Sequence, residues 1–324
     1  MTRAIQIDEH GGPNVLKWRE VDVGNPGKGA VRVRHHAIGL NYIDTYFRTG
    51  IYKPPSLPFV PGGEGAGEIV AVGRGVKEFK PGDRVAYAGG LGAYAEERIM
   101  PADRVVKIPR SVSYEQAAAI ILKGMTAQYL LRRTFKVKKA DTILFHAAAG
   151  GVGQIACQWA SALGATVIGT VGGKAKVRLA KANGCHHVID YSTQDFVERV
   201  KKFTKGAGVD VVYDGVGKDT YPASLDCLRP LGMWVLFGQS SGPVPPVDLA
   251  ILAPKGSLFV TRPTLATYIA KREDLLKAAR DVFRVVGDGT VKVAINQRYA
   301  LKDAAKAHRD LEGRKTTGAT VLIP

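Results

Sequence analysis

The feature that most constrains this 324-residue chain is a regular recurrence of short apolar runs in its second half. Runs rich in Val, Ile, Leu and Phe begin at residues 142, 166, 187, 209, 233 and 257, so successive starts lie 21 to 24 residues apart. This spacing equals one strand plus one crossover helix, and it predicts six parallel strands with helices on both faces. The runs are continuous rather than alternating, which is typical of strands buried on both faces. The expected fold class is α/β, with a doubly wound parallel sheet.

The first part of the chain has a different rhythm. Short β segments at 30–40, 67–73, 83–89 and 104–109 are separated by Gly/Pro turns such as Pro81-Gly82. This pattern predicts a compact domain resembling a β-barrel.

After Pro263 the pattern changes again. We expect a long helical stretch at 265–286, a strand at 293–300, a helix at 302–312 and a final strand, all returning to the first domain. The predicted domains are a catalytic domain formed by 1–122 with 266–324 and a dinucleotide-binding domain formed by 123–265.

A glycine-rich turn follows the first of the six runs, in HAAAGGVGQIACQWA (146–160). Ala147, Gly150 and Gly153 are spaced through the turn, and the apolar residues after it fall on one helical face. In such a turn Gly150 allows a tight bend and Gly153 allows close packing of helix on strand, while unpaired N–H groups face a pyrophosphate. The segment predicts a Rossmann dinucleotide site, although Ala147 stands where the simplest fingerprint has glycine. The alternative is a tight turn without a ligand.

The end of the second run indicates which dinucleotide binds. NAD-binding units place an acidic residue there that accepts from the ribose hydroxyls, but this chain has GGKAK at 172–176 and no acid before Asp190. Lys174, Lys176 and Arg178 would attract a 2′-phosphate that a carboxylate would repel. We therefore expect NADPH. The alternative is that these cations simply cover an exposed helix start.

Composition limits the remaining classes. The net charge is +17, and residues 123–205 hold 14 Lys/Arg against 4 Asp/Glu, which fits a solvated basic face, an acidic small ligand or nucleic acid. The glycines and polar residues of 142–173 argue against a membrane span. The N-terminus has no apolar stretch of the length that a secretory signal needs. Three cysteines without a paired motif favour a reducing cytoplasm.

Several long segments resemble one family, the zinc-free quinone oxidoreductase branch of the medium-chain dehydrogenase/reductase superfamily, which includes bacterial NADPH:quinone reductases and the zeta-crystallins. These segments are AIGLNYIDTYFRTGIY (37–52), VPGGEGAGEIVAVG (60–73), LKGMTAQYLL (122–131), HAAAGGVGQIACQWA and VTRPTL (260–265). The likeness extends from the first residues to the closing LIP. It implies a GroES-like β-barrel catalytic domain beside the Rossmann domain, NADPH as the cofactor, a quinone as the substrate and a homodimer, with a tetramer as the alternative.

The zinc enzymes of the superfamily have GHE where this chain has Gly62-Gly63-Glu64, and a cysteine ligand near the position of Asn41 or Asp44. Residues 74–156 also lack the four cysteines of the structural zinc lobe. The pairs His35-His36 and His186-His187 are expected to be core or surface residues, because neighbours on a strand face opposite ways. We expect no metal and a metal-free hydride transfer to an acceptor that is already electrophilic.

The resemblance also implies the site residues. Asn41, Tyr46 and Tyr52 are expected at the catalytic site, where Tyr46 either donates to the acceptor oxygen or only packs. The expected cofactor contacts are Asn41, Tyr46, Lys123, Thr126, Gly150, Gly151, Val152, Gly153, Gly172, Gly173, Lys176, Tyr191, Phe237, Gly238, Ser240, Phe259, Val260, Arg262 and Arg314.

Two other functions remain open at this stage. An NADPH-dependent enone or enoyl-thioester reductase would use the same chemistry on a different acceptor. A non-catalytic RNA-binding protein would use the same fold and the positive charge.

Overall fold

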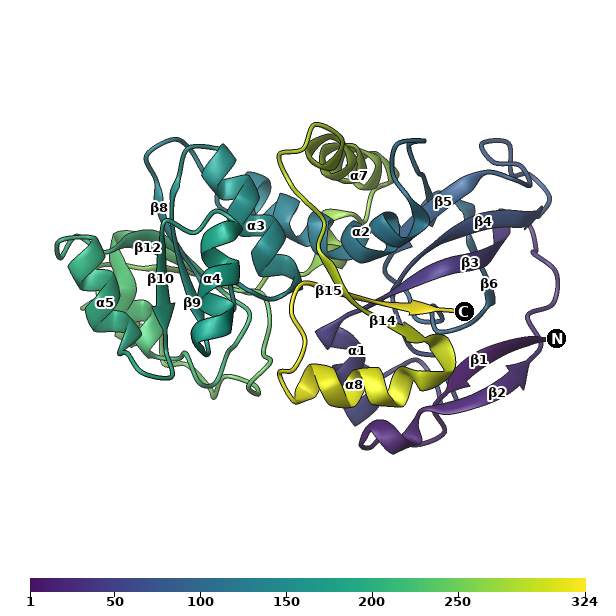
Figure 1. The fold of residues 1–324 in the computed structure, drawn as a ribbon, viewed down its shortest axis with the longest axis horizontal. Helices are drawn as coiled ribbons and strands as arrows, with labels where there is room; N and C mark the ends of the chain where they lie inside the picture. The colour runs from purple at the N-terminus through teal and green to yellow at the C-terminus, as the bar shows by residue number, and fades with distance from the viewer. The chain divides into compact units, whose positions relative to one another are not determined.

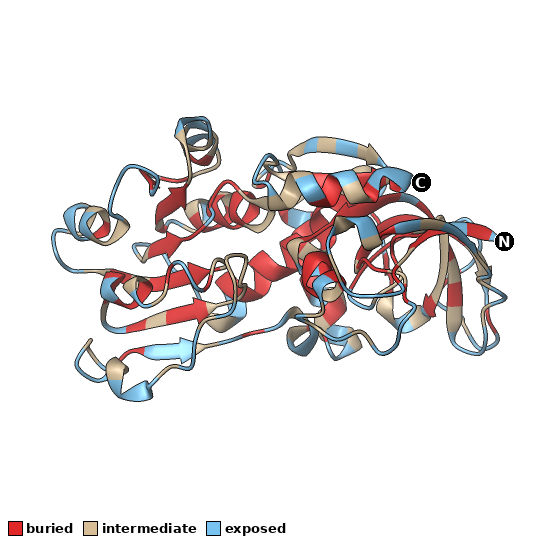
Figure 2. Ribbon diagram, turned by 90° about the horizontal axis from the view of Figure 1, so that it is seen from below, coloured by how far each residue is buried: buried red, intermediate tan, exposed pale blue.

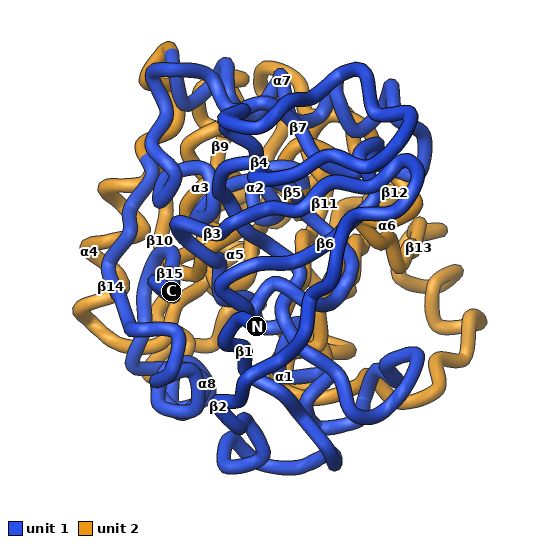
Figure 3. Tube along the Cα trace, turned by 90° about the vertical axis from the view of Figure 1, so that its right-hand side faces the viewer, with its two compact units in different colours: residues 1–125, 269–287, 293–324 blue, residues 126–268, 288–292 orange.

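The computed structural model describes all 324 residues, and their contacts divide the chain into two compact units (Figure 3). Unit 1 contains residues 1–125, 269–287 and 293–324, and unit 2 contains 126–268 and 288–292.

Unit 2 is built on a six-stranded sheet in which every neighbouring pair is parallel. The strand order is β10-β9-β8-β11-β12-β13. Its strands are β8 (Thr142–Phe145), β9 (Thr166–Val171), β10 (His187–Asp190), β11 (Val209–Asp214), β12 (Leu228–Leu236) and β13 (Phe259–Thr261). The six predicted parallel strands and the α/β fold class are confirmed. The order reverses at β8, and in such sheets ligands bind beyond the carboxyl ends of the strands at the reversal.

The helices of unit 2 connect these strands. They are α3 (Gly151–Ala162), α4 (Lys174–Ala182), α5 (Phe196–Phe203) and α6 (Leu265–Tyr268), with 3-10 turns η4 (Ala223–Cys227) and η5 (Leu249–Leu252) and a π-helical turn η3 (Leu130–Thr134). One core cluster joins Leu144 and Ile168 of the sheet to Val200 of α5 and Leu225 of η4. Burial is concentrated in the strands, while the helices also show exposed residues (Figure 2).

Unit 1 contains a seven-stranded sheet and a two-stranded sheet. The order in the larger sheet is β14-β15-β3-β4-β5-β7, with β6 also paired to β3, and β1 pairs with β2. The strands are β1 (Thr2–Gln6), β2 (Lys17–Val21), β3 (Ala30–Leu40), β4 (Glu64–Val72), β5 (Arg84–Ala88), β6 (Glu97–Pro101), β7 (Val106–Lys107), β14 (Ile295–Ala300) and β15 (Ala319–Ile323).

The C-terminal segment shares the core of unit 1 with the N-terminal strands. β15 pairs antiparallel with β3, and Leu301, Ala304 and Leu322 belong to the same apolar cluster as Ile5 and Val31. The helices around this core are α1 (Tyr42–Thr49), α2 (Tyr114–Tyr129), which continues into unit 2, α7 (Arg272–Gly287) and α8 (Ala304–Glu312), with short 3-10 turns η1 (Pro13–Val15), η2 (Ala102–Arg104) and η6 (Leu301–Asp303) (Figure 1).

Two expected elements differ from the structure. The stretch 265–286 is not one helix, because it is interrupted at 269–271, where the carbonyl oxygens of Ile269 and Ala270 accept hydrogen bonds from Arg104 instead of continuing the helix. The expected strand at 104–109 is reduced to β7, because a 3-10 turn ends only at Arg104. None of the helices combines the length and the apolar composition that crossing a membrane requires.

Candidate cofactor and acceptor sites

The glycine turn links β8 to α3 in unit 2. Gly150 is the N-cap of α3 with an extended backbone, and the residue in the left-handed region is Ala147, at φ 55°. Ala147 therefore makes the sharp bend that we expected of Gly150, at a cost that an L-residue with φ above zero incurs. Its carbonyl oxygen accepts from the Gly150 N–H at 2.9 Å, which closes the turn.

Gly153 brings α3 close to this turn. A Cβ atom at Gly153 would lie 2.5 Å from the Ala147 carbonyl oxygen and 2.7 Å from the Ala148 Cα. Both neighbours are main-chain atoms that cannot give way locally, so only glycine fits. The first N–H groups of α3 lack helical partners, and with the helix dipole they favour an anion at this end.

At the junction between β9 and α4, the carboxylate that comes next in the sequence is already hydrogen bonded. Asp190, the nearest carboxylate expected from the sequence, uses its Oδ1 to accept from the Gly173 N–H at 2.8 Å and from the Ser192 hydroxyl at 2.6 Å. These hydrogen bonds lower the pKa of the Asp190 carboxyl group. Lys174 is exposed and Lys176 is half-buried, both in the first turn of α4.

Gly172 and Tyr191 lie against each other at the same junction. A Cβ atom at Gly172 would lie 2.7 Å from the Tyr191 Oη, and Tyr191 is 45% exposed. The two residues expected around the adenosine thus form one surface.

The loop after β12 is held by main-chain hydrogen bonds. Phe237 and Gly238 donate to the Asp214 carbonyl oxygen at 2.8 and 3.3 Å, and Ser240 donates to that of Gly215 at 3.1 Å. The expected residues Phe237, Gly238 and Ser240 therefore lie beside the end of β11, close to the carboxyl edge of the sheet.

The other expected cofactor residues of unit 2 are more dispersed. Phe259 and Val260, on the edge strand β13, are 56% and 40% exposed. Arg262 is exposed just beyond β13, and Thr126 is buried in α2.

Unit 1 gathers Asn41 and Lys123 around one buried acid, Glu64. Glu64 is 0% exposed, and its Oε2 accepts from the Lys123 Nζ at 2.7 Å and from the Asn41 Nδ2 at 2.8 Å, while its Oε1 accepts from the Leu122 N–H at 2.7 Å. The Asn41 amide and the Lys123 ammonium are therefore fixed next to each other by one carboxylate.

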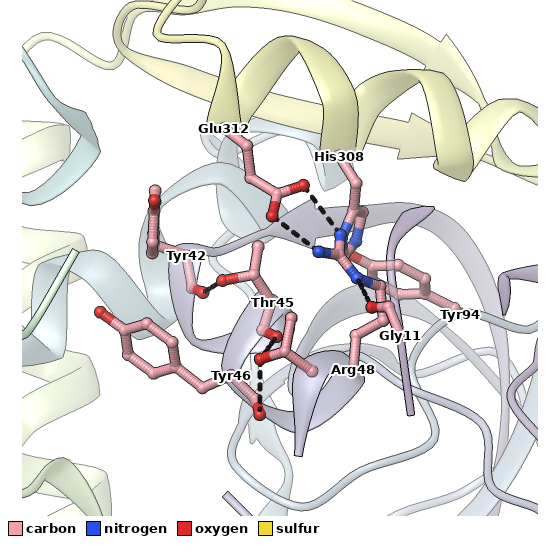
Figure 4. A network of polar contacts seen from close by, with 9 residues as sticks. Gly11, Tyr42, Thr45, Tyr46, Arg48, Tyr94, His308 and Glu312 are labelled. Atoms are coloured by element: carbon pink, nitrogen blue, oxygen red, sulfur yellow. Dashed lines mark hydrogen bonds and ion pairs between the residues drawn. The ribbon is translucent and has the colours of Figure 1, made fainter. Parts of the chain in front are cut away.

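The expected tyrosines form an aromatic group on and after α1. The ring centroid of Tyr46 lies 5.3 Å from that of Tyr52 and 5.7 Å from that of Tyr42, both in edge-on arrangements. The Tyr52 N–H donates to the Tyr46 carbonyl oxygen at 3.0 Å. Figure 4 shows the Tyr46 ring directed away from the polar side chains on the other side of α1. Arg314 lies in the same unit, just after α8, at φ 57°.

Those polar side chains were not predicted from the sequence. They are Asp44, Arg48, Tyr94 and His308, each at most 1% exposed and joined by hydrogen bonds in one chain. Glu312 pairs with Arg48 at the outer end (Figure 4). Burial raises the pKa of Asp44 to about 7 and lowers that of His308 to about 3.

The histidine pairs take the places expected of them. His35 is buried and hydrogen bonds to the Ala95 carbonyl oxygen and the Tyr87 hydroxyl, both at 2.6 Å, while His36 is exposed. Burial lowers the pKa of His35 to about 3. His186 is exposed and His187 half-buried. No group of three or more His, Cys, Asp or Glu side chains is arranged to hold a metal ion.

Comparison with known proteins agrees with both units. Residues 27–110 match the alcohol dehydrogenase GroES-like domain, and residues 151–284 match the zinc-binding dehydrogenase family. Over the full length of both chains the sequence is 52% identical to a quinone oxidoreductase of Pseudomonas aeruginosa. The chain belongs to the quinone oxidoreductase branch of the medium-chain dehydrogenase/reductase superfamily.

A solved structure of Escherichia coli quinone oxidoreductase complexed with NADPH matches with a TM-score of 0.98 at 50% identity, covering 99% of this chain and 100% of that one. A 2-haloacrylate reductase of Burkholderia is 46% identical over 100% of this chain and 99% of its own length. The relatives of this chain thus include proteins that are named for quinones and one that is named for a haloacrylate, an activated alkene.

Proposed function

We propose that this chain is an NADPH-dependent quinone reductase that transfers hydride without zinc. The observation that carries the proposal is the junction after β9, where the residues present fit NADPH. The Asp190 carboxylate beside it accepts hydrogen bonds from Gly173 and Ser192, and Lys174 and Lys176 lie at the start of α4. In the glycine turn, Gly153 lets α3 pack directly on the main chain of Ala147 and Ala148, and the first N–H groups of that helix would bind the pyrophosphate.

NADPH, when bound, supplies the hydride, and a quinone that takes up this hydride and one proton becomes the hydroquinone. In this proposal Asn41 and Lys123 contact the nicotinamide end, with Glu64 fixing both polar groups. Tyr46 lines the acceptor side with Tyr52, and its hydroxyl donates a hydrogen bond to the acceptor oxygen, where negative charge develops. An enzyme of this kind gains rate from orientation and from such preplaced donors.

The remaining proposed contacts follow the cofactor along the chain. Gly150, Gly151, Val152 and Gly153 receive the pyrophosphate, and Gly172, Gly173, Lys176 and Tyr191 surround the adenosine 2′-phosphate. The rest are assigned to the nicotinamide half and its surroundings: Thr126, Phe237, Gly238, Ser240, Phe259, Val260, Arg262 and Arg314.

The first experiment measures NADPH oxidation with 1,4-benzoquinone, 9,10-phenanthrenequinone, 2-chloroacrylate and a simple enone. Quinones are expected to give the largest kcat/KM. Faster turnover of the alkenes would instead favour the second candidate, an enone or haloacrylate reductase, which the 46% identity to the Burkholderia enzyme supports. Silence with every acceptor, together with salt-sensitive RNA binding, would favour a binding function.

Cofactor choice is tested at Lys176. Lys176→Ala should weaken NADPH binding by about 10- to 100-fold, the scale of a lost charge-assisted hydrogen bond, and should leave NADH binding nearly unchanged. Lys181→Ala, on the last turn of the same helix, is the matched control. Equal losses for both coenzymes in Lys176→Ala would show that this side chain does not recognise the phosphate.

The metal-free part of the proposal depends on Gly62-Gly63-Glu64 and Asn41 standing where zinc enzymes have ligands. Prolonged chelation is expected to leave quinone reduction intact. A loss that zinc restores would contradict it.

We also propose a homodimer in the cytoplasm. β13 pairs with β12 on one side only, and its exposed Phe259 and Val260 offer an open apolar edge for a second copy. Light scattering should show twice the mass of the chain, and Val260→Lys should shift the protein toward the monomer. The cytoplasmic assignment is supported by three cysteines that are all free and buried.

A further inference from the structure

A continuous chain of hydrogen bonds runs through the core of unit 1 from α8 to the start of α1, and Figure 4 shows its members Arg48, His308 and Tyr94. Arg48 Nη1 contacts His308 Nδ1 at 2.9 Å, His308 Nε2 contacts the Tyr94 hydroxyl at 3.1 Å, and the Tyr94 hydroxyl contacts Asp44 Oδ2 at 2.9 Å. Asp44 Oδ2 also accepts from the Asn41 main-chain N–H at 2.9 Å. The chain therefore ends on the residue that begins α1.

The direction of every hydrogen bond in this chain follows from chemistry. A guanidinium can only donate, so His308 Nδ1 must accept and the ring proton must lie on Nε2. His308 then donates to the Tyr94 oxygen, which leaves the Tyr94 proton to point at Asp44. Asp44 can accept both this proton and the Asn41 N–H through one oxygen when it is a carboxylate.

The outer end of the chain fixes this direction. Arg48 is 1% exposed and is held by Glu312, whose carboxylate oxygens accept at 2.6 and 2.9 Å, and by the Gly11 carbonyl oxygen at 3.0 Å. Burial and the adjacent Arg48 charge keep the pKa of His308 near 3, so the ring stays neutral at ordinary pH.

We propose that Tyr94 and His308 are positioning residues of the reaction, because they hold Asp44 as a carboxylate and Asp44 fixes the Asn41 main chain. This inference rests on the proposed role of Asn41 at the nicotinamide end. Apolar side chains of similar size would fill this volume at least as stably, so the polar chain is better explained by orientation than by stability.

The groups that face Asp44 determine how it titrates. Burial raises its pKa to about 7, while the Asn41 N–H, the Tyr94 hydroxyl and Lys123 of α2 oppose this rise and Glu64 of β4 adds to it. When Asp44 is protonated, the main-chain N–H of Asn41 loses its charged acceptor. The Asn41 side chain, which donates to Glu64, is then held less firmly in place. Activity should therefore fall on the acid side of a midpoint near the pKa of Asp44.

The decisive variant is Tyr94→Phe. Removing the hydrogen bond to the carboxylate should move the acid midpoint of kcat upward by about one pH unit, so that kcat is low at neutral pH and recovers in mild alkali. The KM for NADPH should change little, because the adenosine and pyrophosphate groups bind unit 2. Tyr87→Phe is the matched control, since Tyr87 is equally buried in the same unit but bonds to His35 instead of Asp44.

Two further variants test the chain at its other links. His308→Leu should move the midpoint in the same direction as Tyr94→Phe but less, whereas His308→Gln, which can still accept from Arg48 and donate to Tyr94, should restore it. Asp44→Asn should have a low kcat that no longer depends on pH in this range.

Two outcomes would overturn the proposal. One is a Tyr94→Phe profile with the same midpoint as wild type and a stability loss matching that of Tyr87→Phe. The other appears in infrared difference spectra of the wild-type protein: if no carboxylic-acid band that Asp44→Asn removes titrates near neutral pH, Asp44 does not change charge there. The spectra need no turnover, so they separate this inference from a failure of quinone reduction.

Discussion

The glycine turn of unit 2 and the Glu64 cluster of unit 1, the two proposed binding sites, are built from different kinds of atoms. The turn uses main-chain groups of Ala147 to Gly153, seven consecutive residues, and no titratable side chain. The cluster uses side chains from β4, α1 and α2, with Lys123 joined to Glu64 across 59 positions. The first site therefore depends on the backbone conformation that its residues can adopt. The second depends on the pairing of charges that are buried in the core.

This difference decides how each site fails. A main-chain site is lost when a new side chain enters it, as at Gly153. A side-chain site is lost when one member of a buried ion pair is removed. The remaining charge is then buried without the attraction that offset the free energy of removing it from water. The predictions below test this contrast, from the largest effect to the smallest.

The largest effect is expected from Lys123→Met. Glu64 would remain fully buried without its cationic partner, which should lower the free energy of unfolding by about 3–5 kcal/mol. The double variant Glu64→Gln/Lys123→Met should recover most of this loss, measured by urea denaturation. Additive losses in the double variant would mean that the pair is not coupled.

The second largest effect is expected from acid, which should destabilise unit 1 through its buried titratable side chains. The pKa values of His35 and His308 are lowered to about 3 by burial, whereas that of Asp44 is raised to about 7. Between about pH 6.5 and 4 these two imidazoles bind two protons in the unfolded chain, whereas Asp44 binds one proton in the folded chain. Together these three groups of unit 1 lower the unfolding free energy by about 1.4 kcal/mol for each pH unit of acidification. The buried His146 of unit 2, whose pKa burial also lowers, acts in the same direction.

Thermal or urea unfolding at several pH values measures this slope. His35→Gln removes one imidazole, so the contributions of His308 and Asp44 should then nearly cancel. A variant whose slope matches that of wild type would contradict the buried, neutral state of His35.

Gly153→Ala should cost about 1–3 kcal/mol, because the added methyl group meets the Ala147 oxygen and the Ala148 Cα. It should also weaken NADPH at least tenfold, measured by fluorescence titration. Gly287→Ala is the matched control, since a Cβ there meets nothing within 4 Å. Wild-type affinity in Gly153→Ala would show that the close approach is not needed for binding.

The smallest effect is expected from Arg298→Ala. Arg298 forms an ion pair with Glu115 at 2.7 Å, but the two side chains are 54% and 39% exposed. Such a pair contributes about 1 kcal/mol or less. A loss comparable to that of Lys123→Met would show that burial is not what distinguishes the two pairs.

The same contrast explains what the sequence could reveal. The six strands and the glycine turn were predictable because each depends on residues within one strand–helix unit. The Glu64 cluster was not predicted, although the position of Glu64 in the sequence gave a reason to expect a partner for it. Glu64 follows two glycines at the position where the zinc enzymes have GHE, and it begins an apolar strand, a place where a carboxylate needs a buried partner.

The series of hydrogen bonds from Arg48 to Asp44 could not be predicted from local sequence patterns. Tyr94 and His308 lie 214 positions apart, and Arg48 and His308 lie 260 apart. The break in the helix at 269–271 has the same origin, since Arg104 reaches Ala270 across 166 positions. Periodicity carries no information about such partners.

The contact between Gly172 and Tyr191 has a consequence for how coenzyme preference can evolve. An acid at position 172, where NAD-dependent relatives of this fold hold the ribose, would bring its Cβ to 2.7 Å from the Tyr191 hydroxyl. A single mutation toward NADH would therefore have to push the exposed Tyr191 ring aside. The same substitution that adds a carboxylate for the ribose would thus also displace a side chain proposed to lie beside the adenosine, so coenzyme preference and the position of this ring would change together.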